Sequence, residues 1–170
     1  MLEREPPTAA FRLYVARPER DLACVQRRDV TLRQIVLALL VAGMVGLAAE
    51  LLLLEHFDSW QQWIPLVMLA LGVPAAIVLW RAPSPRTIRV FRQLMSLMVV
   101  TGALGLYLHL QGNIEFALER DPGLRGIGLL WKAMRGATPT LAPGALAQLG
   151  LLGLAYTFRH PTTTHEKNSE

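Results

Sequence analysis

Four apolar runs, each close to the length that crosses a bilayer, alternate with polar segments along this chain. The runs cover residues 34–54, 63–80, 90–110 and 141–158. An α-helix needs about 20 mostly apolar residues to cross the hydrocarbon core, and in lipid a spanning segment must pair its own backbone groups. The sequence therefore predicts an all-α integral membrane protein with four transmembrane helices in a bundle.

The segments outside these runs are too short and too polar to form a second core. Of the 170 residues, 52% are hydrophobic and 18% are charged. We therefore expect one membrane domain over residues 34–158, between an Arg-rich arm over residues 1–33 and a polar tail over residues 159–170. Because Cys24 is the sole cysteine, no disulfide forms within the chain.

The basic residues predict the orientation of the chain. Seven Lys or Arg residues precede the first run, none lies between the first and second runs, and four lie from Arg81 to Arg92. By the positive-inside rule both termini are expected in the cytoplasm, in a bacterial inner (plasma) membrane. Because the Arg residues flank apolar runs, as topology signals do, they do not indicate nucleic-acid binding.

The outer segment, residues 111–140, is expected to stay at the membrane surface. Its apolar residues Ile127, Leu130, Trp131 and Met134 recur at helical spacing, opposite Lys132. This pattern predicts a short interfacial helix.

Two sequence patterns predict where helices begin. Ser59 and Gln62 have the spacing of a capping box at the start of the second run. Ser84 followed by Pro85 is typical of an N-cap and first helical residue, here before the third run.

A stripe of small residues in the first run ends in a carboxylate. Ala38, Ala42, Gly46 and Glu50 are four residues apart and share one helix face. Small residues let transmembrane helices approach closely, so we expect this face to contact protein and Glu50 to point into the bundle.

Two further polar residues lie in the apolar runs at depths from which they could meet Glu50. His109 follows Thr101 and Gly105 on one face of the third run, and Gln148 lies in the fourth. The sequence therefore predicts a buried polar cluster of Glu50, His109 and Gln148. It is either a set of hydrogen bonds between helices or a functional protonation site.

A second group of polar side chains is expected at the outer rim. It consists of one His and several carboxylates, whose nitrogen and oxygen atoms are suitable ligands for zinc, iron or manganese. Neither a Glu-x-x-His nor a His-Glu-x-x-His pair is present in the sequence. No cofactor is therefore predicted, and a divalent metal remains an alternative. Asp58 can instead cap a helix, and the two later acids can lie in the first turns of a short helix. The rim residues are Glu55, His56, Asp58, Glu115 and Glu119.

The expected four spans with Glu50 in the first superficially resemble the small multidrug resistance transporters. The resemblance implies that such a carboxylate exchanges protons for cationic drugs. It covers the architecture and Glu50 only: in that family the carboxylate lies near mid-membrane and the loops are minimal. Here Glu50 is near the outer end, and the chain has a long arm and a long outer segment.

Three functions remain open from the sequence. The first is an accessory, assembly or structural partner of a larger membrane complex, with a membrane protein or a second copy as partner. The second is a small proton- or cation-handling transporter that uses Glu50 and His109. The third is a metal-binding membrane protein. Enzymatic activity is the less favoured expectation, because Ser59, Ser84 and Ser96 have no nucleophile-elbow context.

Overall fold

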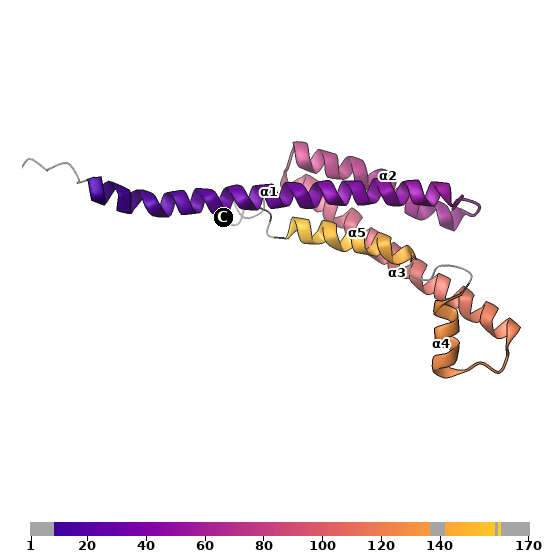
Figure 1. The fold of residues 1–170 in the computed structure, drawn as a ribbon. Helices are drawn as coiled ribbons and strands as arrows, with labels where there is room; N and C mark the ends of the chain where they lie inside the picture. Colours follow the sequence, from indigo (N-terminus) through magenta and orange to yellow (C-terminus); the bar gives the residue numbers. More distant parts are fainter. Residues whose placement is uncertain (1–8, 137–141, 159, 161–170) are drawn as a thin grey trace, which may run out of the picture. The chain divides into compact units, whose positions relative to one another are not determined.

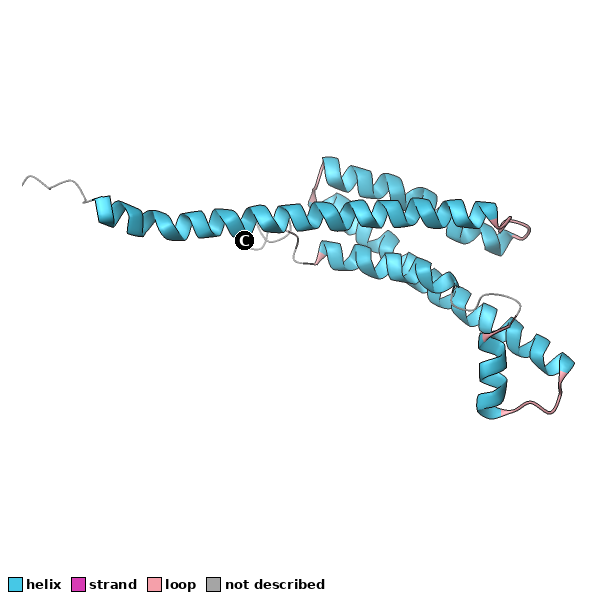
Figure 2. Ribbon diagram, in the orientation of Figure 1, coloured by secondary structure: helices cyan, strands magenta, loops and turns pink. Residues whose placement is uncertain are grey.

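Every regular element in the described part of the chain is an α-helix (Figures 1 and 2). A computed structural model describes residues 9–136, 142–158 and 160. The chain divides after Val36 into two compact units, and α1 passes through both. The packing below lies within the second unit. The helices are α1 (Ala9–Leu53), α2 (Trp60–Arg81), α3 (Pro85–Arg120), α4 (Gly126–Met134) and α5 (Ala142–Thr157).

Three of the helices are long and apolar enough to cross a membrane. They are Val30–Leu53 within α1, the whole of α2, and α3. The expectation of a helical membrane protein is therefore confirmed. α5 has the predicted bounds to within about one residue, but its 16 residues extend only about 24 Å, less than the roughly 30 Å of hydrocarbon.

α3 is the helix around which the others pack. It contacts α2, α4 and α5 (Figure 1). Phe91, Met95 and Met98 of α3 are completely buried at the centre of an apolar core. Residues of α1, α2 and α5 complete this core: Leu37, Leu40, Met44, Met68, Leu69, Ala76, Leu79 and Leu146.

Small residues bring α3 and α5 into close contact. A Cβ atom added at Gly102 of α3 would lie 2.5 Å from the backbone nitrogen of Ala147. One added at Gly150 of α5 would lie 2.6 Å from the carbonyl oxygen of Met95. Because apolar burial adds little between helices in lipid, van der Waals contact of this kind is what holds them together.

Both predicted helix starts are confirmed. The Ser59 backbone N–H donates to Oε1 of Gln62 at 3.1 Å, which pairs the N-cap of α2. At α3, the Ser84 N–H donates to Oγ1 of Thr87 at 2.8 Å, and the Thr87 N–H donates to Oγ of Ser84 at 3.1 Å. Pro85 occupies the first turn of α3, where a backbone N–H has no partner within the helix, so the missing N–H of proline costs no hydrogen bond.

The outer segment differs from the expectation. α3 does not end near Leu110 but continues to Arg120, giving 36 residues and a length of about 54 Å. Polar residues such as Gln111 and Glu115 are compatible with this because all backbone groups stay paired inside the helix. Glu115 and Glu119 therefore lie in the last turns of α3, not in the first turns of a separate helix.

The chain termini also add to the sequence expectations. The Arg-rich arm is helical from Ala9 and continuous with the first span in α1. Most of the tail, with residues 159 and 161–170, lies outside the described residues. His160 is buried, and its ring centroid lies 5.9 Å from that of Tyr156.

Candidate functional site

The turn between α1 and α2 is built around Glu55. Its φ angle of 52° is in the left-handed region, which non-glycine residues rarely adopt. The His56 N–H donates to the Leu51 carbonyl at 2.9 Å, and the Glu55 N–H donates to the Leu52 carbonyl at 3.1 Å. These two bonds form a Schellman motif, in which Glu55 occupies the position usually taken by glycine. The structure thus gives Glu55 a backbone role at the end of α1.

This turn brings His56 against α3. The ring centroids of His56 and His109 are 6.3 Å apart, with an angle of 43° between the ring planes. Nδ1 of His109 is buried and has no hydrogen-bond partner among the described residues. A buried polar atom without a partner is costly, so this nitrogen marks a place where a proton, a water molecule or a ligand atom can bind.

The surroundings of His56 favour its neutral form. Burial and the neighbouring His109 lower the pKa of His56 from its ordinary value of 6.5, against the opposing effect of the Asp58 carboxylate. Two imidazoles in contact cannot both carry a proton without repulsion.

Glu50 and Gln148 are not part of this site. Both side chains are exposed, as are Ala38, Ala42 and Gly46 of the α1 stripe. The expected buried cluster of Glu50, His109 and Gln148 therefore does not form within the chain. The physical reason is that α1 turns its larger side chains, Leu40 and Met44, into the core, and these leave the stripe on the opposite face.

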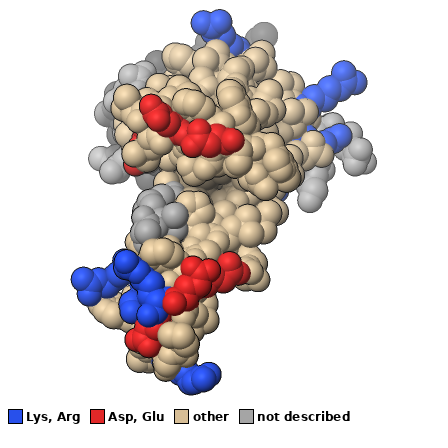
Figure 3. Space-filling view, turned by 90° about the vertical axis from the view of Figure 1, so that its right-hand side faces the viewer, with Lys and Arg blue, Asp and Glu red and all other residues tan. Residues whose placement is uncertain are grey.

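The expected rim is divided between two places. Figure 3 shows two separate groups of acidic side chains on this face of the molecule. Glu55, His56 and Asp58 lie in the turn after α1, whereas Glu115 and Glu119 are exposed on α3 beyond His109. Nε2 of Gln111 donates to Oε1 of Glu115 at 3.1 Å. The described residues contain no group of three or more His, Cys, Asp or Glu side chains placed to hold a metal ion.

The contact between α3 and α4 was not predicted from the sequence. Ala117 of α3 and Ala133 of α4 are buried in this contact. The side chain of Asn113, also buried, lies against Gly136. The four-residue spacing of Asn113 and Ala117 is a usable signal, but it becomes one only once α3 is known to be helical there.

Three large apolar side chains of α4 lie outside this contact, whereas Leu129 is half-buried. Ile127 is 87% exposed, Trp131 is 66% exposed and Leu130 is 47% exposed. The Arg135 guanidinium lies 5.9 Å from the centroid of the Trp131 ring. The described residues therefore offer two candidate sites: the His56–His109 pair, with the unpartnered Nδ1 of His109, and the exposed face of α4, which can bind an apolar surface.

No protein-family model matches this sequence, and no curated protein or solved structure matches it.

Proposed function

We propose that this protein is an accessory or assembly partner of a larger membrane complex, and that α4 is its docking element. The observation that supports the proposal is the way α4 packs. It buries its small residue Ala133 against α3 and exposes Ile127, Leu130 and Trp131. Large apolar side chains that are exposed and do not pack within the fold are typical of a surface that binds a partner.

The length of α3 favours a protein partner over the lipid surface. Residues 111–120 continue the helix about 15 Å past the predicted span. The headgroup layer on one side of a bilayer is only about 5–8 Å thick. Because α4 packs on this extension, it lies at the outer edge of the headgroups or beyond. An apolar face at that position is stabilised by contact with another protein.

The proposal includes a bundle of four spans with α5 as the fourth, and both termini in the cytoplasm of a bacterial inner membrane. Two features support it. α5 lies against α3 along close glycine contacts, and the charge asymmetry of the loops follows the positive-inside rule. A short helix such as α5 can span if the bilayer thins locally or if flanking residues reach the interface.

Photo-crosslinking in native membranes tests the docking element. A photoreactive side chain at Ile127 should give a stoichiometric protein adduct, and one at Lys132, whose charged side chain lies outside the apolar set, should give much less. Replacing Ile127 and Trp131 by Asn should lower co-extraction of the same partner about tenfold or more, as for the loss of interface anchors. Adducts with lipid alone, or extraction of only the free chain, would refute the proposal.

A proton-handling role is the second candidate, because the His56–His109 contact leaves Nδ1 of His109 unpartnered. Glu50 is exposed and would act in such a role only at a contact with another chain. Proton flux into liposomes should then fall in both His109→Gln and Glu50→Gln. If Glu50→Gln leaves the flux unchanged, the transporter that uses Glu50 and His109 is excluded.

Metal binding is the third candidate and has the least support. Metal analysis of the purified protein and of the double variant His56→Gln, His109→Gln tests it directly. Equal metal content in the two preparations would exclude a site at this pair.

A further inference from the structure

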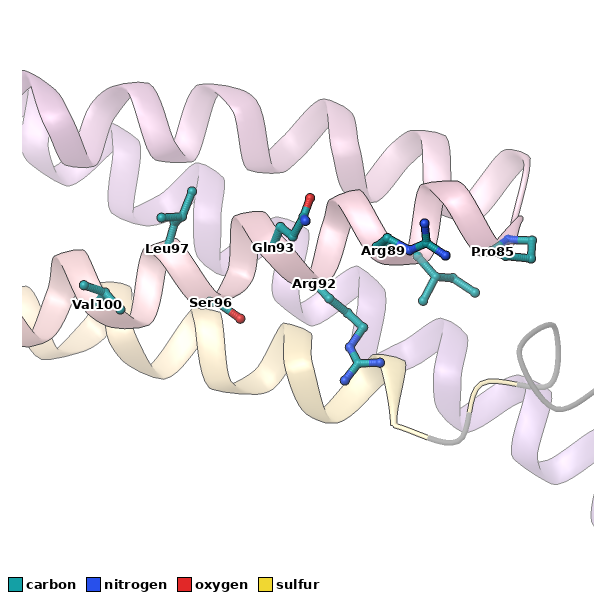
Figure 4. A pocket seen from close by; sticks show the side chains of 8 residues that line it. Pro85, Arg89, Arg92, Gln93, Ser96, Leu97 and Val100 are labelled. Carbon is teal, nitrogen blue, oxygen red and sulfur yellow. The ribbon is translucent and has the colours of Figure 1, made fainter. Parts of the chain in front are cut away.

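The face of α3 near its amino-terminal end carries an open groove. Figure 4 shows Arg92 and Ser96 pointing toward the side of α5, and Gln93 and Leu97 toward the side of α2. A second hollow shares Arg92 and Ser96 with this groove and is also lined by Leu154 and Ala155 of α5 and by Phe158, which follows that helix. The groove itself is lined by Pro85, Ile88, Arg89, Arg92, Gln93, Ser96, Leu97 and Val100.

The charged end of the groove has no counter-ion among the side chains that the structure describes. Arg89 and Arg92 are exposed, and neither guanidinium has an ion-pair or hydrogen-bond partner among the described residues. The residues that line both hollows include no Asp or Glu. Unpaired guanidinium groups at a membrane face attract anionic headgroups, and the planar guanidinium suits a phosphate because it binds two oxygens at once.

The other end of the groove is apolar. Leu97 and Val100 continue the same face of α3, and Val100 lies eight residues past Arg92, or about 12 Å deeper along the helix. Gln93 and Ser96 lie between the two ends and offer neutral hydrogen-bonding groups. A ligand that matches this order has an anionic head, a polar linkage and an apolar chain.

We propose that this groove binds one anionic phospholipid. The phosphate lies between Arg89 and Arg92, the Ser96 hydroxyl donates to an oxygen of the linkage region, and an acyl chain lies along Leu97 and Val100. The second hollow holds the other chain beside Leu154 and Phe158. This site is at the opposite end of α3 from α4, and it is independent of the docking function proposed above.

Native mass spectrometry of the detergent-solubilised chain tests the site, with phosphatidylglycerol and phosphatidylcholine as probes. Wild type should retain one phosphatidylglycerol and bind phosphatidylcholine much more weakly. The double variant Arg89→Gln, Arg92→Gln should bind phosphatidylglycerol about 25-fold more weakly, from about fivefold for each Arg near headgroups. The double variant Arg81→Gln, Arg86→Gln loses the same charge outside the groove, at the end of α2 and in the first turn of α3. It should change the affinity less than twofold.

Two further measurements make every outcome decisive. Val100→Trp places a bulky side chain in the apolar end of the groove and leaves the charge unchanged. Because Val100 is exposed, the helical content should stay the same. The variant should nevertheless lose the bound lipid. Inorganic phosphate at millimolar concentration should not displace the lipid. Equal weakening by the two Arg pairs would mean bulk charge attraction. Displacement by phosphate, or retention by Val100→Trp, would mean that only an anion site is present. Each of these results overturns the proposal.

Discussion

α3 and α1 each carry a stripe of small residues, but only the α3 stripe, Gly102 and Gly105, is covered by another helix. A Cβ atom at Gly102 would lie 2.5 Å from the Ala147 backbone, whereas one at Gly46 of α1 would have nothing within 4 Å. Ala38 and Ala42 of the α1 stripe are exposed as well. The same kind of sequence pattern thus forms a tight helix contact in one place and an open surface in the other.

The difference shows that small residues permit close approach without selecting a partner. Gly102 meets α5 because Pro143, Ala147 and Gly150 give that helix an equally small face. α1 instead packs on other helices through Leu40 and Met44, whose bulk keeps its backbone farther from theirs. A close helix contact requires small residues on both helices at the same level.

The largest expected effect separates the two stripes directly. Gly102→Leu should lower the free energy of unfolding by about 3 kcal/mol, because the new side chain meets backbone atoms of α5 that cannot turn aside. Gly46→Leu is the matched control: with nothing within 4 Å of the new Cβ it should not lower the free energy of unfolding, and helix propensity should raise it by about 0.5–1 kcal/mol. Reversible unfolding in mixed micelles measures both. A similar loss in the two variants would mean that the α1 stripe is also covered.

A smaller change tests the edge of the same contact within one helix. In Gly105→Ala the new Cβ would lie 2.9 Å from Cβ of Pro143, so we expect a net loss of about 1 kcal/mol. Gly112→Ala, with nothing within 4 Å, should instead gain about 0.5–1 kcal/mol from helix propensity. Opposite signs in the same unfolding assay are expected. Equal signs would place the end of the α3–α5 contact elsewhere.

The α1 stripe ends in the Schellman turn, which gives a third prediction. Glu55→Gly should raise the free energy of unfolding by up to about 1 kcal/mol, because glycine adopts a φ of 52° without steric cost. Glu55→Ala is the control and should not stabilise the protein. If Glu55→Gly destabilises it, the Glu55 side chain makes a contact that the turn geometry does not explain.

The smallest expected effect concerns the His56–His109 contact at the far end of the α3 stripe. The lowered pKa of His56 means that the unfolded chain binds its proton more readily than the folded one. The stability that neutral His56 contributes to the folded state is fully present above about pH 6.5, the ordinary pKa of histidine. It is lost as the pH falls through the lower folded-state pKa. Melting temperatures between about pH 5 and about pH 8 should show this loss, and His56→Gln should remove it.

Asp58 gives the control for the direction of this effect. Its carboxylate favours protonated His56, so Asp58→Asn should lower the pKa of His56 further and strengthen the pH dependence. An unchanged or weaker dependence in Asp58→Asn would contradict the assigned cause.

Much of the helical layout could be predicted from the sequence, and the polar contacts could not. Apolar length identified the three helices that are long and apolar enough to span, and local hydrogen bonding located the starts of α2 and α3 at Ser59 and Ser84. Periodicity also identified α4 and its apolar face. The end of α3 does not follow from apolar length, because that rule does not apply to a helix that continues past its apolar run. The inward position expected for Glu50 requires the small-residue face of α1 to be its core face, but in the structure Leu40 and Met44 form the core face.

The sequence by itself determined that this protein is helical and belongs in a membrane, because hydrocarbon demands long apolar helices with paired backbones. It also determined where several helices begin, since capping involves only neighbouring residues. Only the tertiary structure decided which face of each helix is covered. That choice depends on whether the residues of two facing helices match in size and position. Gly102 and Ala147 match in this way, and the α1 stripe has no such counterpart among the described residues.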